Sequence, residues 1–128
     1  MEYCCHVWGG APKRYLDLLD KLQRRICYHI GPALSSSLQP LAHRRNVASL
    51  SLFYRYYFER CSNELSKLVP KPFGSARPTR HSDRQQVFVV ELPNFKKEFY
   101  RNLFFPRSAS LWNSLPLECF PLTYNPNL

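Results

Sequence analysis

Prolines are the feature that most restricts the fold of this chain. Its 128 residues include 11 prolines, and each proline removes a backbone donor and disfavours a helical conformation in the residue before it. We therefore expect few long regular elements. The length fits one domain with one core. An apolar content of 45%, with 15% aromatic residues, argues against wholesale disorder.

The clearest helix is predicted after Gly9-Gly10-Ala11, with Pro12 in its first turn and Gly31-Pro32 at its end. Apolar residues recur there at helical spacing: Tyr15, Leu18, Leu19, Leu22, Ile26 and Ile30. The opposite face is mainly basic, with Lys13, Arg14, Asp17, Lys21, Arg24 and Arg25. We expect an amphipathic helix whose apolar stripe belongs to the core.

A second amphipathic helix is predicted between Pro40 and Cys61. Its apolar positions again follow the helical period: Leu41, Val47, Leu50, Phe53, Tyr54, Tyr57, Phe58 and Cys61. A short helical turn is expected over residues 62–68, ending at Val69-Pro70 because a residue before proline avoids the helical region.

The C-terminal part predicts a hairpin and one more helix. Residues 87–92 are rich in β-branched and aromatic side chains and precede Pro93, as is typical of a strand. Residues 99–105 would supply its partner, and the hairpin would lie on the helices. Ser108 is the expected N-cap of a short helix over residues 109–115 that contains Trp112 and ends before Pro116.

The predicted fold class is therefore α+β, mainly α, in a single small domain or domain fragment. It combines two amphipathic helices, a short β-hairpin and a short Trp-containing C-terminal helix. Residues 1–69 form the helical part, residues 70–86 a basic loop rich in Pro, Ser and Arg, and residues 87–128 the hairpin with the short helix.

The chain is strongly basic, with 18 Lys and Arg against 9 Asp and Glu, a net charge of +9. Basic side chains that neutralise phosphates release condensed counterions, so a polyanion is the natural class of partner. The alternative is a solvated basic surface without a specific ligand.

Arginines beside aromatic rings suggest where single-stranded nucleic acid would bind, because bases stack on rings and phosphates pair with guanidinium groups. The predicted phosphate contacts are Arg44, Arg45, Arg55, Arg77, Arg80 and Arg84, with Tyr54 or Tyr56 as stacking partner. The last three arginines belong to the loop over residues 71–84, which carries a net charge of +3 and would follow a phosphate backbone. Alternatively, the tyrosines pack against the first helix, the helix arginines are merely solvated and the loop is mobile.

Other chemistry finds little support in the sequence. The five cysteines form no even framework, and residues 1–6 have neither a basic leader nor an apolar run, so we expect an intracellular protein, in cytoplasm or nucleus, that is not secreted. Cys4-Cys5-His6 and Cys27-Tyr28-His29 lack the paired spacing of zinc ligands, which favours free thiols over a metal site. No nucleophile elbow, triad spacing or phosphate-cradling glycine loop is present in the sequence. No membrane span, cofactor, metal or small-molecule substrate is predicted.

The runs NLFFPRS (102–108) and LWNSLP (111–116) resemble the region downstream of the polymerase domain in non-LTR retrotransposon reverse transcriptases of the jockey-like kind. Residues 3–22 (YCCHVWGGAPKRYLDLLDKL), 41–57 (LAHRRNVASLSLFYRYY) and 117–124 (LECFPLTY) resemble the same proteins in the same order. The resemblance covers nearly the whole chain. Such proteins usually continue beyond the position of Asn127-Leu128.

The resemblance implies a parent RNA-directed DNA polymerase, usually with an upstream endonuclease. Polymerase chemistry needs aspartates that hold two Mg²⁺ ions, yet this chain has only Asp17, Asp20 and Asp83, in no Tyr-x-Asp-Asp-type motif. We therefore expect a non-enzymatic C-terminal fragment that helps the parent protein hold RNA or single-stranded DNA, with the parent polymerase domain as its protein partner. The alternatives are a packing module, docked through the second helix and the Trp112 segment, and a decayed orphan reading frame without independent function.

Overall fold

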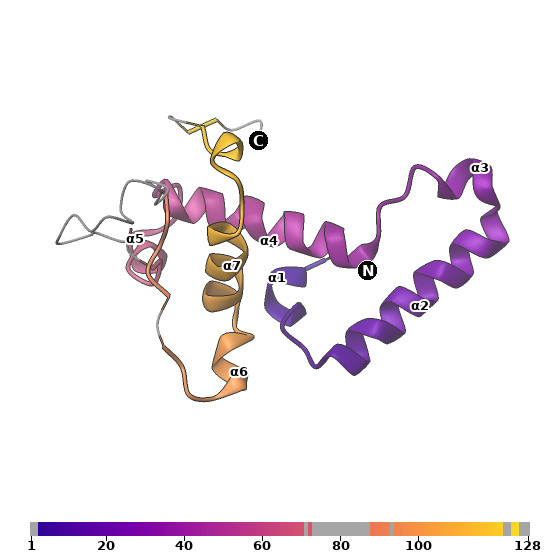
Figure 1. The fold of residues 1–128 in the computed structure, drawn as a ribbon, viewed down its shortest axis with the longest axis horizontal. Helices are drawn as coiled ribbons and strands as arrows, with labels where there is room; N and C mark the ends of the chain where they lie inside the picture. Colours follow the sequence, from indigo (N-terminus) through magenta and orange to yellow (C-terminus); the bar gives the residue numbers. More distant parts are fainter. Residues whose placement is uncertain (1–2, 71, 73–87, 93, 122–123, 126–128) are drawn as a thin grey trace.

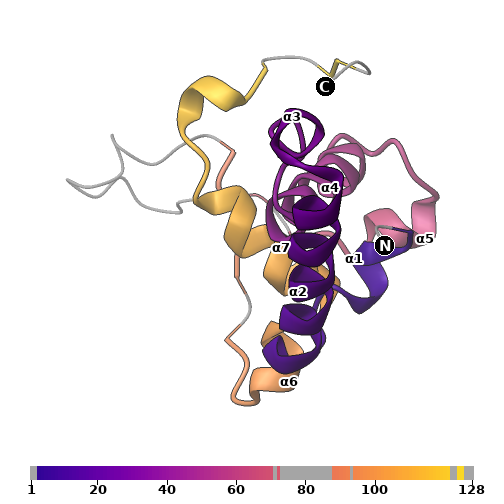
Figure 2. The same ribbon diagram turned by 90° about the vertical axis from the view of Figure 1, so that its right-hand side faces the viewer.

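Helices dominate the computed structural model of the chain, which describes residues 3–70, 72, 88–92, 94–121 and 124–125 (Figure 1). In order, the elements are α1 (Cys5–Trp8), α2 (Lys13–Ile30), α3 (Pro32–Ser35), α4 (Leu41–Tyr57), α5 (Asn63–Ser66), α6 (Glu98–Arg101), α7 (Phe104–Asn113) and the 3-10 turn η2 (Leu117–Cys119). α7 crosses the C-terminal half of α4, and α2 lies beside the N-terminal half (Figures 1 and 2). The mainly helical prediction is confirmed, as are both amphipathic helices and the helix that contains Trp112.

The core lies where α4 meets α7. Phe53 of α4 is fully buried and Trp112 of α7 is 2% exposed, with ring centroids 5.2 Å apart. Tyr54 stacks on Tyr124 at 5.3 Å, and Phe120 packs edge-on against Trp112 at 4.8 Å. Burial of such large rings supplies much of the stability of a small domain. Aromatic residues of the second predicted helix, α4, therefore form the core of the fold together with α7.

α2 forms where the sequence predicts it, but its apolar stripe is not part of the core. No residue of α2 is buried, and Leu18 and Leu22 are 56% and 51% exposed. α2 is attached to α4 through a polar edge instead. Asp20 forms an ion pair with Arg45 at 3.0 Å, and Gln23 accepts a hydrogen bond from the Leu41 backbone N–H at 2.8 Å. These contacts hold α2 at an angle that leaves the stripe in solvent.

α4 ends at Tyr57, earlier than the predicted Cys61. Glu59 adopts a left-handed conformation with φ of 55°, which interrupts the helix, and the Arg60 backbone N–H donates to the Arg55 carbonyl at 2.8 Å. Such a closure satisfies a carbonyl that the helix end leaves without a partner. The predicted short turn after α4 is confirmed as α5.

The predicted hairpin does not form in the described part of the chain. Among the described residues Val90 takes part only in an isolated bridge to Pro72, and residues 99–105, the expected partner strand, belong largely to α6 and α7. The Asn113 side chain takes the place of a neighbouring strand. Its Oδ1 accepts from the Val90 N–H at 3.0 Å, and its Nδ2 donates to the Val90 carbonyl at 2.9 Å. Because Val90 is 1% exposed, this amide pair satisfies backbone groups that water cannot reach.

α7 begins at Phe104, four residues before the predicted N-cap, Ser108. Pro106 occupies the third helical position, where a backbone N–H has no helical acceptor, so the ring is tolerated. Ser108 is consequently an interior residue and is fully buried. The prediction that Ser108 caps this helix is wrong, because a proline in the first turn does not mark a boundary.

The loop between α1 and α2 is fastened to the end of α6. A Cβ placed on Gly10 would overlap the Asn102 carbonyl oxygen, and one on Gly9 would overlap the Cys5 carbonyl oxygen and lie 2.9 Å from Nη1 of Arg107. Both positions therefore require glycine because the chain approaches closely. This packing brings the N-terminal segment against the side chains that form the site below.

Candidate nucleic-acid interface

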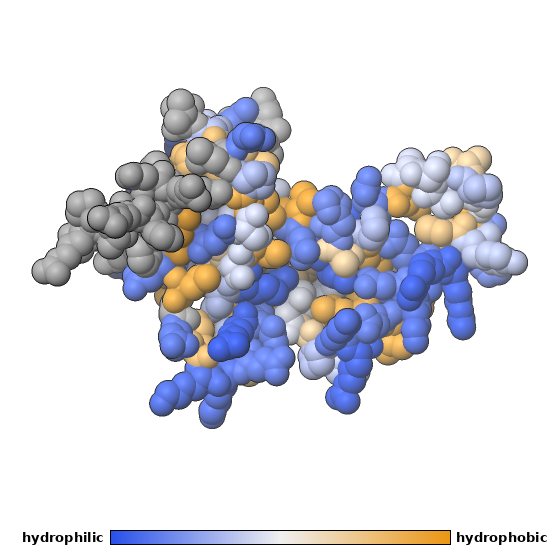
Figure 3. Space-filling model, viewed as in Figure 1, coloured by the Kyte–Doolittle hydropathy of each residue, from blue (hydrophilic) through white to orange (hydrophobic). Residues whose placement is uncertain are grey.

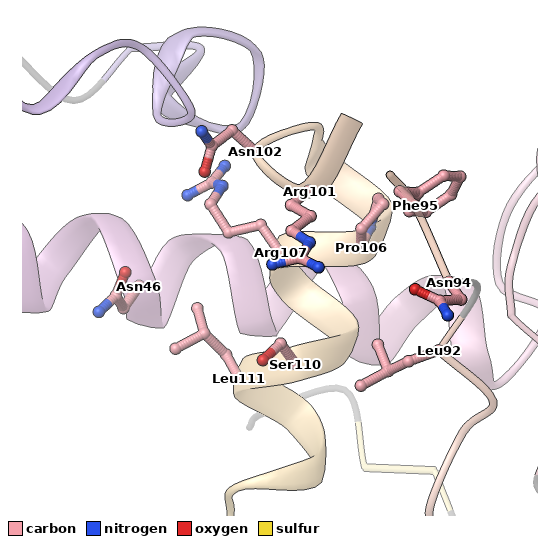
Figure 4. A pocket seen from close by; sticks show the side chains of 10 residues that line it. All are labelled: Asn46, Leu92, Asn94, Phe95, Arg101, Asn102, Pro106, Arg107, Ser110 and Leu111. Carbon is pink, nitrogen blue, oxygen red and sulfur yellow. The ribbon is translucent and has the colours of Figure 1, made fainter. Parts of the chain in front are cut away.

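An open hollow of about 550 Å³ lies along α7, between α4 and the segment that leads into α6 (Figure 4). Two arginines, three asparagines and one serine supply its polar lining, and four residues supply the apolar part. In chain order these are Asn46, Leu92, Asn94, Phe95, Arg101, Asn102, Pro106, Arg107, Ser110 and Leu111. The site therefore joins donors and an aromatic ring from several segments of the chain.

Three packing contacts place these segments together. The Asn113 amide holds Val90 against α7, and Leu92, Asn94 and Phe95 line the hollow beside that helix. Phe95 then stacks on Tyr100 of the next segment, with centroids 5.8 Å apart and planes 20° from parallel. The tight turn from α6 to α7 sets Arg101 and Arg107 on the same side of the hollow.

Arg107 is the most unusual group in the site. Its Nη2 donates to the His6 carbonyl at 3.4 Å, while its Nε is buried and has no hydrogen-bond partner among the described residues. Burial lowers the pKa of Arg107; the Cys5 side chain acts against that shift, and the positive Arg45 adds to it. A guanidinium group remains charged in proteins, so an anion beside Arg107 would relieve a cost that the structure leaves in place.

Arg101 adds a second, exposed guanidinium group to the same hollow. Its side chain reaches over α7 between Arg107 and Asn94, and the Arg107 guanidinium extends toward Asn102 (Figure 4). Two guanidinium groups with amide side chains nearby suit a phosphate diester, and the half-buried Phe95 ring offers a face for a base. The hollow therefore combines cationic, amide and aromatic side chains of the kind that bind a nucleotide.

The structure gives Arg45 and Tyr54 roles inside the fold. Arg45 is 5% exposed and binds both carboxylate oxygens of Asp20, at 3.0 and 3.3 Å. Tyr54 is 8% exposed, and its hydroxyl accepts a hydrogen bond from the Asn125 backbone N–H at 2.7 Å. Neither side chain is presented to a ligand in this conformation.

The other predicted residues on α4 are not gathered around the hollow. Tyr56 is half-buried and packs on Phe104 and Phe105, with centroids 6.0 and 5.9 Å away. Arg55 is exposed and Arg44 is half-buried. These two arginines are eleven residues apart, so they share one face of α4, and Asn46, nine residues before Arg55, is on the opposite face. The predicted Arg77, Arg80 and Arg84 lie outside the described residues.

Sequence reasoning missed Arg101, Arg107 and Phe95. It assigned Phe95 and Arg101 to the hairpin and placed Arg107 just before the expected helix, so it gave no reason for the three side chains to line one site. One signal was present, because Arg107 belongs to the NLFFPRS run that carries the family resemblance.

Within the part of the chain that the structure describes, no group of three or more His, Cys, Asp and Glu residues is arranged to hold a metal ion. Each of the five cysteines is a free thiol. Of the helices described, none is long and apolar enough to cross a membrane. Comparisons with known proteins found no matching family model, no similar curated protein and no similar solved structure.

Proposed function

We propose that this chain is a non-catalytic C-terminal fragment of a retrotransposon RNA-directed DNA polymerase that assists the parent protein in binding RNA or single-stranded DNA inside the cell. The observation that carries the proposal is the hollow that contains Arg101 and Arg107. Three of its lining residues, Asn102, Pro106 and Arg107, belong to the run that resembles the family.

The charges around the hollow support this role. Arg107 lacks a carboxylate partner among the described residues, and the positive charge of Arg45 adds to the lowering of its pKa. A phosphate placed between Arg107 and Arg101 would therefore gain two charge-assisted contacts in a partly desolvated site. The excess of nine positive charges over the whole chain adds a long-range attraction for any polyanion.

Fluorescence anisotropy with a labelled single-stranded RNA, measured across a salt series, tests this proposal. Removal of one phosphate-binding cation should weaken binding and reduce the slope of log K against log salt by about 0.7 for a single strand. We expect this change for Arg101→Gln, because Arg101 is exposed and its replacement should leave the fold intact.

Lys67→Gln is the matched control, since Lys67 is equally an exposed cation but lies beyond α5, away from the hollow. It should bind with nearly the affinity of the wild type. Equal binding by wild type and Arg101→Gln, or equal losses for Arg101→Gln and Lys67→Gln, would refute a specific role for the hollow.

A role in protein packing is the second candidate, and the structure narrows how it could work. Trp112 is 2% exposed because it packs on α4 of the same chain, so its ring is used inside this fold. The uncovered apolar stripe of α2 is the observation that favours a protein partner.

A further inference from the structure

The apolar face of α2 is uncovered along its whole length. Five large residues on one side of the helix are each at least 40% exposed: Tyr15, Leu18, Leu22, Ile26 and Ile30. At 1.5 Å per residue the stripe is about 22 Å long. Hydrophobic side chains remain visible beside hydrophilic ones in the region of α2 (Figure 3). Continuous exposed apolar surface of this kind marks an interaction site in a soluble domain.

The orientation of α2 is fixed, so the stripe is not free to turn inward. Asp20 is paired with the buried Arg45, and Gln23 bonds the Leu41 N–H at 2.8 Å and the Gln39 carbonyl at 3.0 Å. Turning the stripe toward α4 would break these contacts and leave Arg45 without its carboxylate, which is costly for a buried charge.

An open hollow of about 640 Å³ borders the stripe on one side. Its lining residues are Leu18, Lys21, Leu22, Arg24, Arg25 and Tyr28. Three of these six residues are cations and all three are exposed. Lys21 and Arg25 follow Leu18 and Leu22 by three residues, so they lie at the edge of the basic face that is nearest the stripe. Apolar residues flanked by positive charge match an apolar seam flanked by carboxylates. This is the pattern by which one amphipathic helix recognises another.

We propose that α2 docks an acidic amphipathic helix of a protein partner, with apolar side chains of that helix on the stripe and its carboxylates on Lys21 and Arg25. A second copy of this chain fits less well, because it would place like charges opposite each other. A bilayer offers no projecting side chains to occupy the hollow beside the stripe. The proposal goes beyond nucleic-acid binding, since none of the residues around the Figure 4 hollow belongs to α2.

Two synthetic helices provide the test. Both are about 20 residues long with leucine at heptad positions a and d, and the flanking e and g positions carry glutamate in one and lysine in the other. Titration of the isotope-labelled chain, followed by amide NMR, gives both the site and the affinity. We expect the glutamate helix to shift signals of residues 15–30 and to bind at least about tenfold more tightly than the lysine helix.

Three variants decide whether the stripe and its cations are responsible. The double variant Leu18→Gln, Leu22→Gln should lower the affinity for the glutamate helix at least about tenfold. The double variant Lys21→Glu, Arg25→Glu should bind the lysine helix more tightly than the glutamate helix. Leu68→Gln, at a residue 61% exposed but distant in sequence from α2, should bind like the wild type. Each double variant must keep the wild-type circular dichroism spectrum.

Several results would overturn the proposal. These are equal affinity for both helices, shifts confined to residues outside α2, or binding only to vesicles that contain phosphatidylserine. Concentration-dependent dimerisation that Leu22→Gln abolishes would assign the stripe to a second copy instead. Loss of RNA affinity in Arg101→Gln, with binding of the glutamate helix retained, would separate this site from the hollow along α7.

Discussion

Replacing Ser108 with alanine should make the protein more stable. Ser108 lies in the interior of α7 with 0% exposure, and its Oγ has no hydrogen-bond partner among the described residues. A buried hydroxyl without a partner costs about 1 to 3 kcal/mol, and alanine is favoured over serine inside a helix by up to about 0.5 kcal/mol. The loss of packing by one small atom offsets part of this gain. We expect the free energy of unfolding to rise by about 1 to 2 kcal/mol.

Urea denaturation followed by far-UV circular dichroism measures the change. With a typical slope for a small protein, the midpoint should increase by about 1 M. Ser114→Ala is the matched control, because Ser114 is exposed and its hydroxyl donates only to the Leu111 carbonyl at 2.7 Å. Its midpoint should change little. If Ser108 were a helix cap, its replacement would lower stability by about 1 kcal/mol, so a decrease in the midpoint would refute the reasoning.

Three further changes test the contacts that hold the fold. Asn113→Ala removes two hydrogen bonds to buried backbone and should lower the free energy of unfolding by about 2 to 4 kcal/mol in the same assay; a decrease below about 1 kcal/mol would argue against this amide pair. Asp20→Ala leaves Arg45 buried without its carboxylate and should lower the free energy of unfolding by about 2 to 3 kcal/mol. Asp17→Ala, on the same helix, should change the free energy of unfolding little. Equal effects of the two substitutions would contradict the ion pair. Burial raises the pKa of Tyr57 above its ordinary value of 10.0, so the neutral hydroxyl favours the folded state. The free energy of unfolding should therefore fall as the pH rises above about 10. Tyr57→Phe should make this decline shallower, and an unchanged decline would contradict the raised pKa of Tyr57.

The long helices could be predicted because they depend on local pattern. The apolar period and the flanking Pro and Gly residues located the end of α2 at Ile30 and its start close to Lys13, although Pro12 is the N-cap and not part of the first turn. The burial of α2 could not be predicted in the same way. Periodicity reveals that a helix has an apolar face, but the polar contacts of Asp20 and Gln23 decide which face meets α4.

The hairpin was a wrong prediction for a related reason. The residues before Pro93 favour an extended backbone, and local preference does not identify what satisfies the backbone groups. In the structure an asparagine 23 residues away supplies both hydrogen bonds to Val90. Such a contact between a side chain and a distant backbone has no signature in composition or period.

The candidate site was predicted only at the level of its chemistry. Excess arginine and aromatic residues indicated a polyanion partner, but the sequence grouped neighbours along the chain. Arg45 and Tyr54 belong to the group that the sequence placed on the second helix, and in the structure both side chains are buried within the fold. Arg101, Arg107 and Phe95 line the same hollow because the turn between α6 and α7 and the position of Val90 bring their segments together.

Photo-crosslinking tests the central claim most directly. A single-stranded RNA that carries 4-thiouridine is irradiated with the wild-type chain, and the crosslinked peptides are identified by mass spectrometry. The account predicts crosslinks within residues 92–111, with Phe95 among the modified residues, and their disappearance in Arg101→Gln. Crosslinks that are confined to α2 or α5, or that persist unchanged in Arg101→Gln, would contradict it.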